Sequence, residues 1–238
     1  MKRHVSLEEI SDGHLYDAQG VVKVGCGGCR GCSYCCRDMG ESAILDPLDL
    51  MRMEQATGLS PKVLLEEGKI ELNVVDGVVL PNLRMREEDG ACVFLNREGR
   101  CDIHAFRPGI CRLFPLGRLY HETKKSVVGG NIEWDTADSF QYFVQIYECP
   151  APNKTKVRIR KWLEQPDLPR YEAYILAWHN FLEHAETRIK YETDDLIIRN
   201  INLLILEVFF MKPYDQEEDF YVQFEERLAT TKDVLEIS

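Results

Sequence analysis

The feature that most constrains this chain is the spacing of its cysteines. Four recur at every third position and a fifth follows directly, namely Cys26, Cys29, Cys32, Cys35 and Cys36. Glycines fill most of the gaps between the first three, where no hydrophobic pattern would place them. The four remaining cysteines lie further along the chain, at Cys92, Cys101, Cys111 and Cys149. The thiols of this region therefore need an explanation before any fold is considered.

Disulfide bonding and simple burial both explain the cysteines poorly. The first nine residues lack the apolar run of a secretory signal, and cytosolic thiols are kept reduced. The cysteine count, nine in 238 residues, is odd and too sparse for a disulfide scaffold. Burial as a small hydrophobic side chain suits a single cysteine, but it does not produce a strict spacing of three.

Metal binding is the explanation that the spacing favours. A Cys-x2-Cys step lets two thiolates converge on one ion or cluster, and glycines permit the tight turns between them. Short C-x2-C-x2-C runs are typical of iron–sulfur clusters with a remote fourth cysteine. Cys149, which Pro150 follows, is a candidate for that remote ligand. Structural zinc prefers paired steps from separate segments, which the chain also offers, so both metals stay open.

The adjacent pair Cys35 and Cys36 bears on the number of sites. In an extended segment their side chains would point to opposite faces, and in a helical turn they would be awkward ligands of one tetrahedral ion. We expect them to serve different sites, or one to be a ligand while the other is packed. Eight or nine thiols would suffice for two four-ligand sites.

The cysteine-bearing part is expected to contain short mixed elements. Helices are predicted from Pro47 to Gly58 and from Pro61 to about Gly68, each opened by a capping residue before a proline. The Asp-Gly turn within 74–79 predicts a hairpin. A second hairpin over 92–104 would bring Cys92 near Cys101. Further strands are predicted over 116–121 and 140–147.

After residue 150 the apolar residues change to a helical period. Three amphipathic helices are predicted, over about 171–189, over 197–209 and from a capping box at Asp215 and Glu218. The predicted fold class is α+β: a small, loop-rich, metal-binding cysteine domain over residues 1–150, followed by a helical C-terminal section over residues 151–238.

Charge and hydropathy limit the partners of the chain. Its 29 Lys and Arg against 40 Asp and Glu give a net charge of −11. Nucleic acid and anionic membranes need a basic surface, so neither is expected as a partner. No apolar stretch is long enough to span a bilayer. We expect a soluble cytoplasmic protein whose partner, if it has one, is another protein; the oligomeric state is not indicated.

The motifs together resemble a known family. The run from Cys29 to Cys36 reads C-x2-C-x2-C-C, the signature of the YkgJ-type cysteine-cluster proteins, which are described as zinc- or iron-chelating. The segment from Cys92 through Cys101 to His104 continues the similarity, and Arg107 to Pro115 matches R-P-x-x-C-R-x-F-P. The resemblance covers about residues 26 to 150 and leaves the helical tail out.

The resemblance implies a set of metal-associated cysteines. They are Cys29, Cys32, Cys35, Cys36, Cys92, Cys101, Cys111 and Cys149. Cys26 is additional to the family pattern. His104 extends Cys101 into a C-x2-H step that looks like zinc, but we expect a packed or hydrogen-bonded histidine there. Arg107 and Arg112 are expected either to bind a substrate carboxylate, to offset thiolate charge, or to pair with a nearby acid.

The family also includes the flagellin lysine N-methylases, which implies one enzymatic alternative. A protein of this kind would transfer a methyl group from S-adenosylmethionine to a protein lysine. No S-adenosylmethionine-binding loop and no catalytic residue can be named from the sequence. A 4Fe-4S cluster is the expected cofactor, with zinc as the alternative and S-adenosylmethionine as a further possibility. The third hypothesis for the function, beside a metal-binding cysteine-cluster protein and a methylase, is a structural-zinc interaction module without catalysis.

Overall fold

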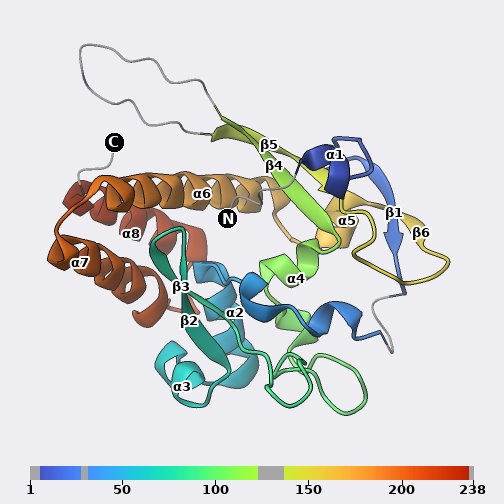
Figure 1. Ribbon diagram of the computed structural model, residues 1–238, viewed down its shortest axis with the longest axis horizontal. Coiled ribbons are helices and arrows are strands. Elements are labelled where there is room, and N and C mark those ends of the chain that lie inside the picture. Colours follow the sequence, from blue (N-terminus) through green and yellow to red (C-terminus); the bar gives the residue numbers. More distant parts are fainter. Residues whose placement is uncertain (1–5, 28–31, 123–136, 236–238) are drawn as a thin grey trace.

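The computed structural model describes residues 6–27, 32–122 and 137–235. It contains short helices and three two-stranded antiparallel sheets, whose strands lie between Val21 and Arg158, followed by long helices (Figure 1). This arrangement confirms the predicted α+β class. No helix among the described residues combines the length and apolar character that crossing a bilayer requires.

Up to Leu83, the described residues form five helical segments, the strand β1 and the β2–β3 hairpin. Its elements are α1 (Leu7–Ile10), β1 (Val21–Gly25), the 3-10 helices η1 (Tyr34–Cys36) and η2 (Gly40–Ser42), α2 (Pro47–Thr57), α3 (Pro61–Glu66), β2 (Ile70–Val75) and β3 (Val78–Leu83). Asp76 and Gly77 both have positive φ, as the predicted tight turn requires. The predicted helices and the 74–79 hairpin are thereby confirmed.

The second half supplies the remaining strands and the long helices. They are the 3-10 helix η3 (His104–Phe106), α4 (Gly109–Leu113), β4 (Leu116–Glu122), β5 (Ala137–Val144), β6 (Thr155–Arg158), α5 (Ile159–Leu163), α6 (Leu168–Tyr191), α7 (Asp195–Leu206), the π-helical turn η4 (Glu207–Met211) and α8 (Phe220–Leu235). β4 pairs with β5, and β1 pairs with β6. The β1–β6 pairing joins segments on the two sides of residue 150, and the division into domains at that residue stays a prediction.

Two predicted details were wrong. The third C-terminal helix begins at Phe220, not at Asp215, because Asp219 accepts the hydrogen bond from the Val222 backbone N–H at 3.1 Å. Asp215 instead accepts from Glu217 N–H at 2.9 Å in the preceding turn. The second hairpin is reduced to one bridge between Leu95 and Cys101, since turns fill the rest of that segment.

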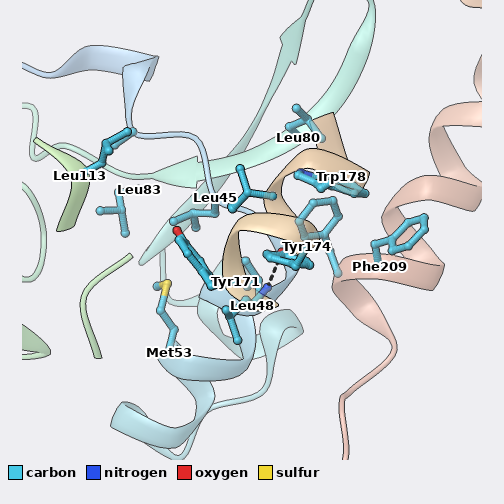
Figure 2. Close-up of a cluster of buried hydrophobic side chains, with 14 of the residues drawn as sticks. Leu45, Leu48, Met53, Leu80, Leu83, Leu113, Tyr171, Tyr174, Trp178 and Phe209 are labelled. Atoms are coloured by element: carbon cyan, nitrogen blue, oxygen red, sulfur yellow. Dashed lines mark hydrogen bonds between the residues drawn. The ribbon is translucent and has the colours of Figure 1, made fainter. Parts of the chain in front are cut away.

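A continuous hydrophobic core joins the cysteine-bearing part to the C-terminal helices. Figure 2 shows residues of α2, β3 and α4 packed against side chains of α6 and η4. Its members include Leu45, Leu48, Met53, Leu80, Leu83, Leu113, Tyr171, Tyr174, Trp178 and Phe209. The Leu48 backbone N–H donates to the Tyr174 hydroxyl at 3.2 Å. The long helices therefore form one wall of the part that carries the cysteines.

Candidate metal centre

Cys36 and Cys92 lie side by side because their backbone segments pair. The Cys92 N–H donates to the Cys36 carbonyl at 2.7 Å, and Asp38 N–H donates to Gly90 carbonyl at 2.8 Å. Cys36 itself ends the short 3-10 helix η1, so Cys35 and Cys36 are not extended. The Cys35 thiol hydrogen-bonds to the Cys36 sulfur. The adjacent pair therefore does not diverge as an extended pair would.

The turns that follow Cys92 bring Cys101 close to it. Leu95 forms a bridge with Cys101, and Asp102 N–H donates to the Phe94 carbonyl at 2.9 Å. Arg86 fastens the same loop, with Nη1 donating to the Leu95 carbonyl at 2.9 Å. The proximity that the sequence predicted for the two cysteines is present, although the expected ladder is not.

Cys111 lies on the short helix α4, whose first residue is anchored by a buried carboxylate. Gly109 N–H donates to Asp49 Oδ1 at 2.7 Å. Asp49 is 1% exposed and belongs to a capping box with Asp46 at the start of α2. The N-terminus of α2 and the cysteine helix α4 are thus tied together at one point.

Four thiols from these segments converge: Cys36, Cys92, Cys101 and Cys111. The charges of Cys92, Cys36 and Cys101 all raise the pKa of Cys111, behind the larger effect of its burial. Cys101 and Cys36 likewise act on Cys92. A sulfur-only donor set of this kind suits zinc or an iron–sulfur cluster and does not suit the oxygen-seeking ions.

All eight cysteines among the described residues line one cavity of about 1010 Å³. Cys26 follows β1, and Cys149 precedes β6, which pairs with β1 from Gly25 opposite Thr155. Cys32 and Cys35 also line this cavity, in addition to the four converging cysteines Cys36, Cys92, Cys101 and Cys111. Cys29 lies outside the described residues. The structure thus places the other seven predicted ligands, and the additional Cys26, around a common space.

The convergence of the thiols is looser than a coordination sphere. No three Cys, His, Asp or Glu side chains in the described part of the chain are arranged to hold a metal ion as they stand. Zinc bonds to sulfur at about 2.3 Å, so four ligands of one zinc lie within about 4 Å of one another. The donor chemistry fits a thiolate centre, whereas the spread of the thiols is wider than one ion would require.

Burial keeps the thiols of Cys92, Cys101 and Cys111 protonated. It raises the pKa of Cys92 to about 11 and raises the pKa values of Cys101 and Cys111 as well. Cys36 is the exception, because the hydrogen bond from Cys35 lowers its pKa to about 7. Metal binding at this site must therefore displace protons.

Three arginines lie where they offset thiolate charge. The positive charges of Arg37, Arg86 and Arg107 lower the pKa values of Cys36, Cys92 and Cys101, respectively, against the effect of burial on each thiol. A tetrathiolate centre carries net negative charge, and nearby cations stabilise it. Each of the three thiols thus has its own arginine.

Glu164 pairs with both arginines that flank Cys111. Its Oε2 lies 3.2 Å from Arg107 Nη2 and 3.3 Å from Arg112 Nη1. Arg112 also donates through Nε to the Arg107 carbonyl at 3.0 Å. The expectation that these arginines pair with a nearby acid is confirmed. His104 lies against Arg107, with Nδ1 3.3 Å from Nη1, and is a hydrogen-bonded histidine as predicted.

Asp49 is a residue of the site that the sequence does not predict. Asp46 before Pro47 predicts a helix cap, and Asp49, three residues later, completes the capping-box signal. Its second function, holding the first residue of α4, depends on a contact across 60 positions of the chain. No local pattern carries that information.

Comparison with known proteins agrees with this geometry. Residues 28–134 match the family model CxxCxxCC, described as "Putative zinc- or iron-chelating domain". Searches of curated proteins and of solved structures found no match. The matched segment contains the four converging thiols of Cys36, Cys92, Cys101 and Cys111. The cysteine-bearing part of this chain, over residues 28–134, is therefore a domain of the CxxCxxCC family.

Proposed function

We propose that this chain is a thiolate-bound metal protein whose inner centre is held by Cys36, Cys92, Cys101 and Cys111. One observation carries the proposal: four thiols from four separate segments converge in one cavity and interact through their charges. A bound metal ion or cluster would offset the mutual repulsion of the thiolates of Cys92, Cys101 and Cys111, which burial otherwise keeps protonated.

We favour an iron–sulfur cluster over zinc at this centre. No three ligand side chains among the described residues are grouped to hold a single ion, and a four-iron cluster separates its ligands by its own width. When bound, a cluster would supply electron transfer or a Lewis-acidic iron, whereas zinc would supply a cross-link. The residues of the chain would supply four thiolates and the charge of Arg37, Arg86 and Arg107.

A second thiolate group is proposed from the remaining cysteines. Cys32, Cys35 and Cys149 line the same cavity, and the family resemblance adds Cys29 to them. Cys26 would be a spare thiol next to this group. A site of this kind needs reduced thiols, so we propose the cytoplasm as the compartment.

An enzymatic function is the second candidate, and the extent of the cavity favours it. The cavity reaches past the thiols to polar and aromatic residues of β4 and α6, which a purely structural centre would not need. Transfer of a methyl group from S-adenosylmethionine to a protein lysine is the reaction that the family resemblance offers. Calorimetric titration with S-adenosylmethionine tests it, and absence of binding to the metal-loaded protein would rule it out.

Anaerobic purification with iron, zinc and acid-labile sulfide analysis tests the main proposal. A brown protein with iron and sulfide in equal amounts is expected, and stoichiometric zinc in a colourless protein would support the structural-zinc alternative instead. Cys111→Ser should lose the inner centre, while Cys26→Ser should keep it and serves as the matched control. Full metal content in Cys111→Ser would contradict the assignment of the ligands.

A further inference from the structure

The cavity that holds the cysteines continues to a buried arginine on β4. Arg118, Tyr120 and Tyr171 line the same cavity as the described cysteines. Arg118 comes from the strand that pairs with β5, and Tyr171 comes from α6. None of these residues belongs to the proposed metal centre, so their presence in the cavity needs a separate account.

Arg118 has few partners for a buried cation. Its Nη2 donates to the Tyr171 hydroxyl at 3.2 Å, and its guanidinium lies 5.5 Å from the Phe140 ring and 5.7 Å from the Tyr171 ring. Nε is buried without a hydrogen-bond partner, and the guanidinium also interacts with the Tyr120 hydroxyl. No carboxylate among the described residues forms an ion pair with Arg118.

The nearest carboxylates are occupied elsewhere. Asp46 and Asp49 hold each other's backbone N–H groups at 3.0 and 3.1 Å in the capping box, and Asp49 also accepts from Gly109. Burial first, and then the charge of Asp46, raise the pKa of Asp49 to about 7. Arg52 acts on both carboxylates as a counter-charge. Neither acid forms an ion pair with Arg118, although the charge of Arg118 also acts on Asp46.

A buried guanidinium without a counter-charge is costly, and an anion in the adjoining cavity removes that cost. The guanidinium of Arg118 gives the anion a donor, and the aromatic residues give it apolar walls. Tyr120 stacks on His179 with ring centroids 3.6 Å apart, and Trp178 also lines the cavity. Convergent polar groups on an apolar wall are the usual composition of a small-molecule site.

We propose that Arg118 binds the carboxylate of a small organic molecule whose remaining part extends along the cavity toward the cysteines. A single arginine matches one negative charge and the planar fork of a carboxylate. A phosphate dianion would need further cations. The inference stands without the proposed metal centre, since no cysteine takes part in the contact.

The test uses the full chain, purified anaerobically with its metal, and benzoate as the probe. Isothermal titration calorimetry compares benzoate with benzamide, which has the same shape without the charge, and with inorganic phosphate. We expect benzoate to bind and the other two not to bind. Phosphate binding in place of benzoate, or equal binding of benzamide, would overturn the carboxylate assignment.

Two variants link the binding to Arg118. Arg118→Lys keeps the charge but loses the fork, and Arg118→Gln loses both; we expect benzoate affinity to fall by about 10- to 100-fold in the first and to vanish in the second. Arg170→Gln, which removes an exposed arginine paired with Asp219, is the control and should bind as the native chain does. If Arg118→Gln does not fold, Arg118→Lys alone carries the test.

Metal analysis of the same preparations separates this inference from the proposed function. Native metal content without benzoate binding would refute the carboxylate site alone. Benzoate binding that depends on Arg118 in a protein without metal would leave the carboxylate site standing and refute the metal centre. Unchanged benzoate affinity in Arg118→Lys would show that another group binds the probe, and would also overturn the assignment.

Discussion

At the scale of single residues, arginines lie close to the converging thiols. Arg86 is the clearest case. Its Nε and Nη2 bind both carboxylate oxygens of Asp89 at 2.9 and 2.8 Å, while Nη1 holds the loop after Cys92. One side chain thus fixes the backbone of a ligand loop and places a positive charge beside its thiol.

Replacing Arg86 should therefore weaken metal retention. We expect Arg86→Gln to release metal to a chelator faster than the native protein, because the loop that carries Cys92 loses its tether and its counter-charge. The measurement is the rate of metal transfer to a chromogenic chelator. Arg97→Gln, an exposed arginine in the same region, is the control. Equal rates in the two variants would show that the tether is unimportant.

Asp49 supports the site from a buried position. Asp49→Ala leaves the Gly109 N–H without its acceptor and removes half of the capping box, so we expect a loss of about 2–4 kcal/mol in the free energy of unfolding. Chemical denaturation measures it. Asp49→Asn keeps one acceptor oxygen and should lose less. A stability within about 0.5 kcal/mol of the native value for Asp49→Ala would contradict the anchoring role.

The raised pKa of Asp49, about 7, also predicts a pH dependence. An unfolded aspartate releases its proton near pH 4, whereas burial keeps the proton on folded Asp49 up to about pH 7. The folded state then binds more protons between these values, so the contribution of Asp49 to stability is full below pH 4 and falls as the pH rises to 7. Denaturation curves should show this fall in the native chain and a shallower one in Asp49→Asn. Parallel pH profiles would refute the prediction.

At the scale of elements, α7 holds the β2–β3 hairpin through one polar side chain. Asn202 Oδ1 accepts from Val79 N–H at 2.6 Å, and Nδ2 donates to the Gly77 carbonyl at 3.2 Å. Asn202 is buried within an otherwise apolar helix face. The amide thus satisfies backbone groups of a turn that no third strand covers.

Asn202→Ala should separate this hairpin from the helix. Loss of the amide leaves two backbone groups unsatisfied, and we expect about 1–3 kcal/mol of destabilisation. Hydrogen exchange should show faster opening of 77–79 than in the native protein. Asn200→Ala, an exposed asparagine on the same helix, is the matched control. Equal exchange in both variants would contradict the contact.

The elements that the sequence predicted are those whose signals are local. Asp46 before Pro47 and the Asp76-Gly77 turn each specify their structure over a few residues, and both are present. The pairing of β1 with β6 was not predicted, because it joins short segments more than 100 residues apart that have no common pattern. The predicted start of α8 was wrong because Asp215 and Asp219 are both suitable helix caps, and only packing selects Asp219.

The same distinction applies to the candidate site. Spacing and family resemblance predict the cysteines as ligands without any knowledge of their geometry. Neither predicts the role proposed for Arg118. An arginine in a strand is expected to be exposed, and its burial and its lack of an ion pair depend on contacts between distant segments. The capping aspartates had a local signal, but their contact with α4 had none.

At the scale of the whole molecule, one hydrophobic core joins the cysteine-bearing part to α6, α7 and α8. A metal centre contributes on the order of 10 kcal/mol, comparable with the whole stability of a domain. Metal removal should therefore lower the melting temperature of the entire chain in a single transition. Differential scanning calorimetry tests this. Two separate transitions would instead support independent domains divided near residue 150, and an unchanged melting curve would refute a structural role of the metal.

X-ray absorption at the metal edge of the anaerobically purified chain tests the central claim most directly. The account predicts an inner centre with four sulfur neighbours and, for a cluster, additional iron–iron scattering. In Cys92→Ser the signal of that centre should lose a sulfur neighbour or disappear. A metal surrounded mainly by oxygen and nitrogen, or a spectrum that Cys92→Ser leaves unchanged, would contradict the convergence of the four thiols on one inorganic centre.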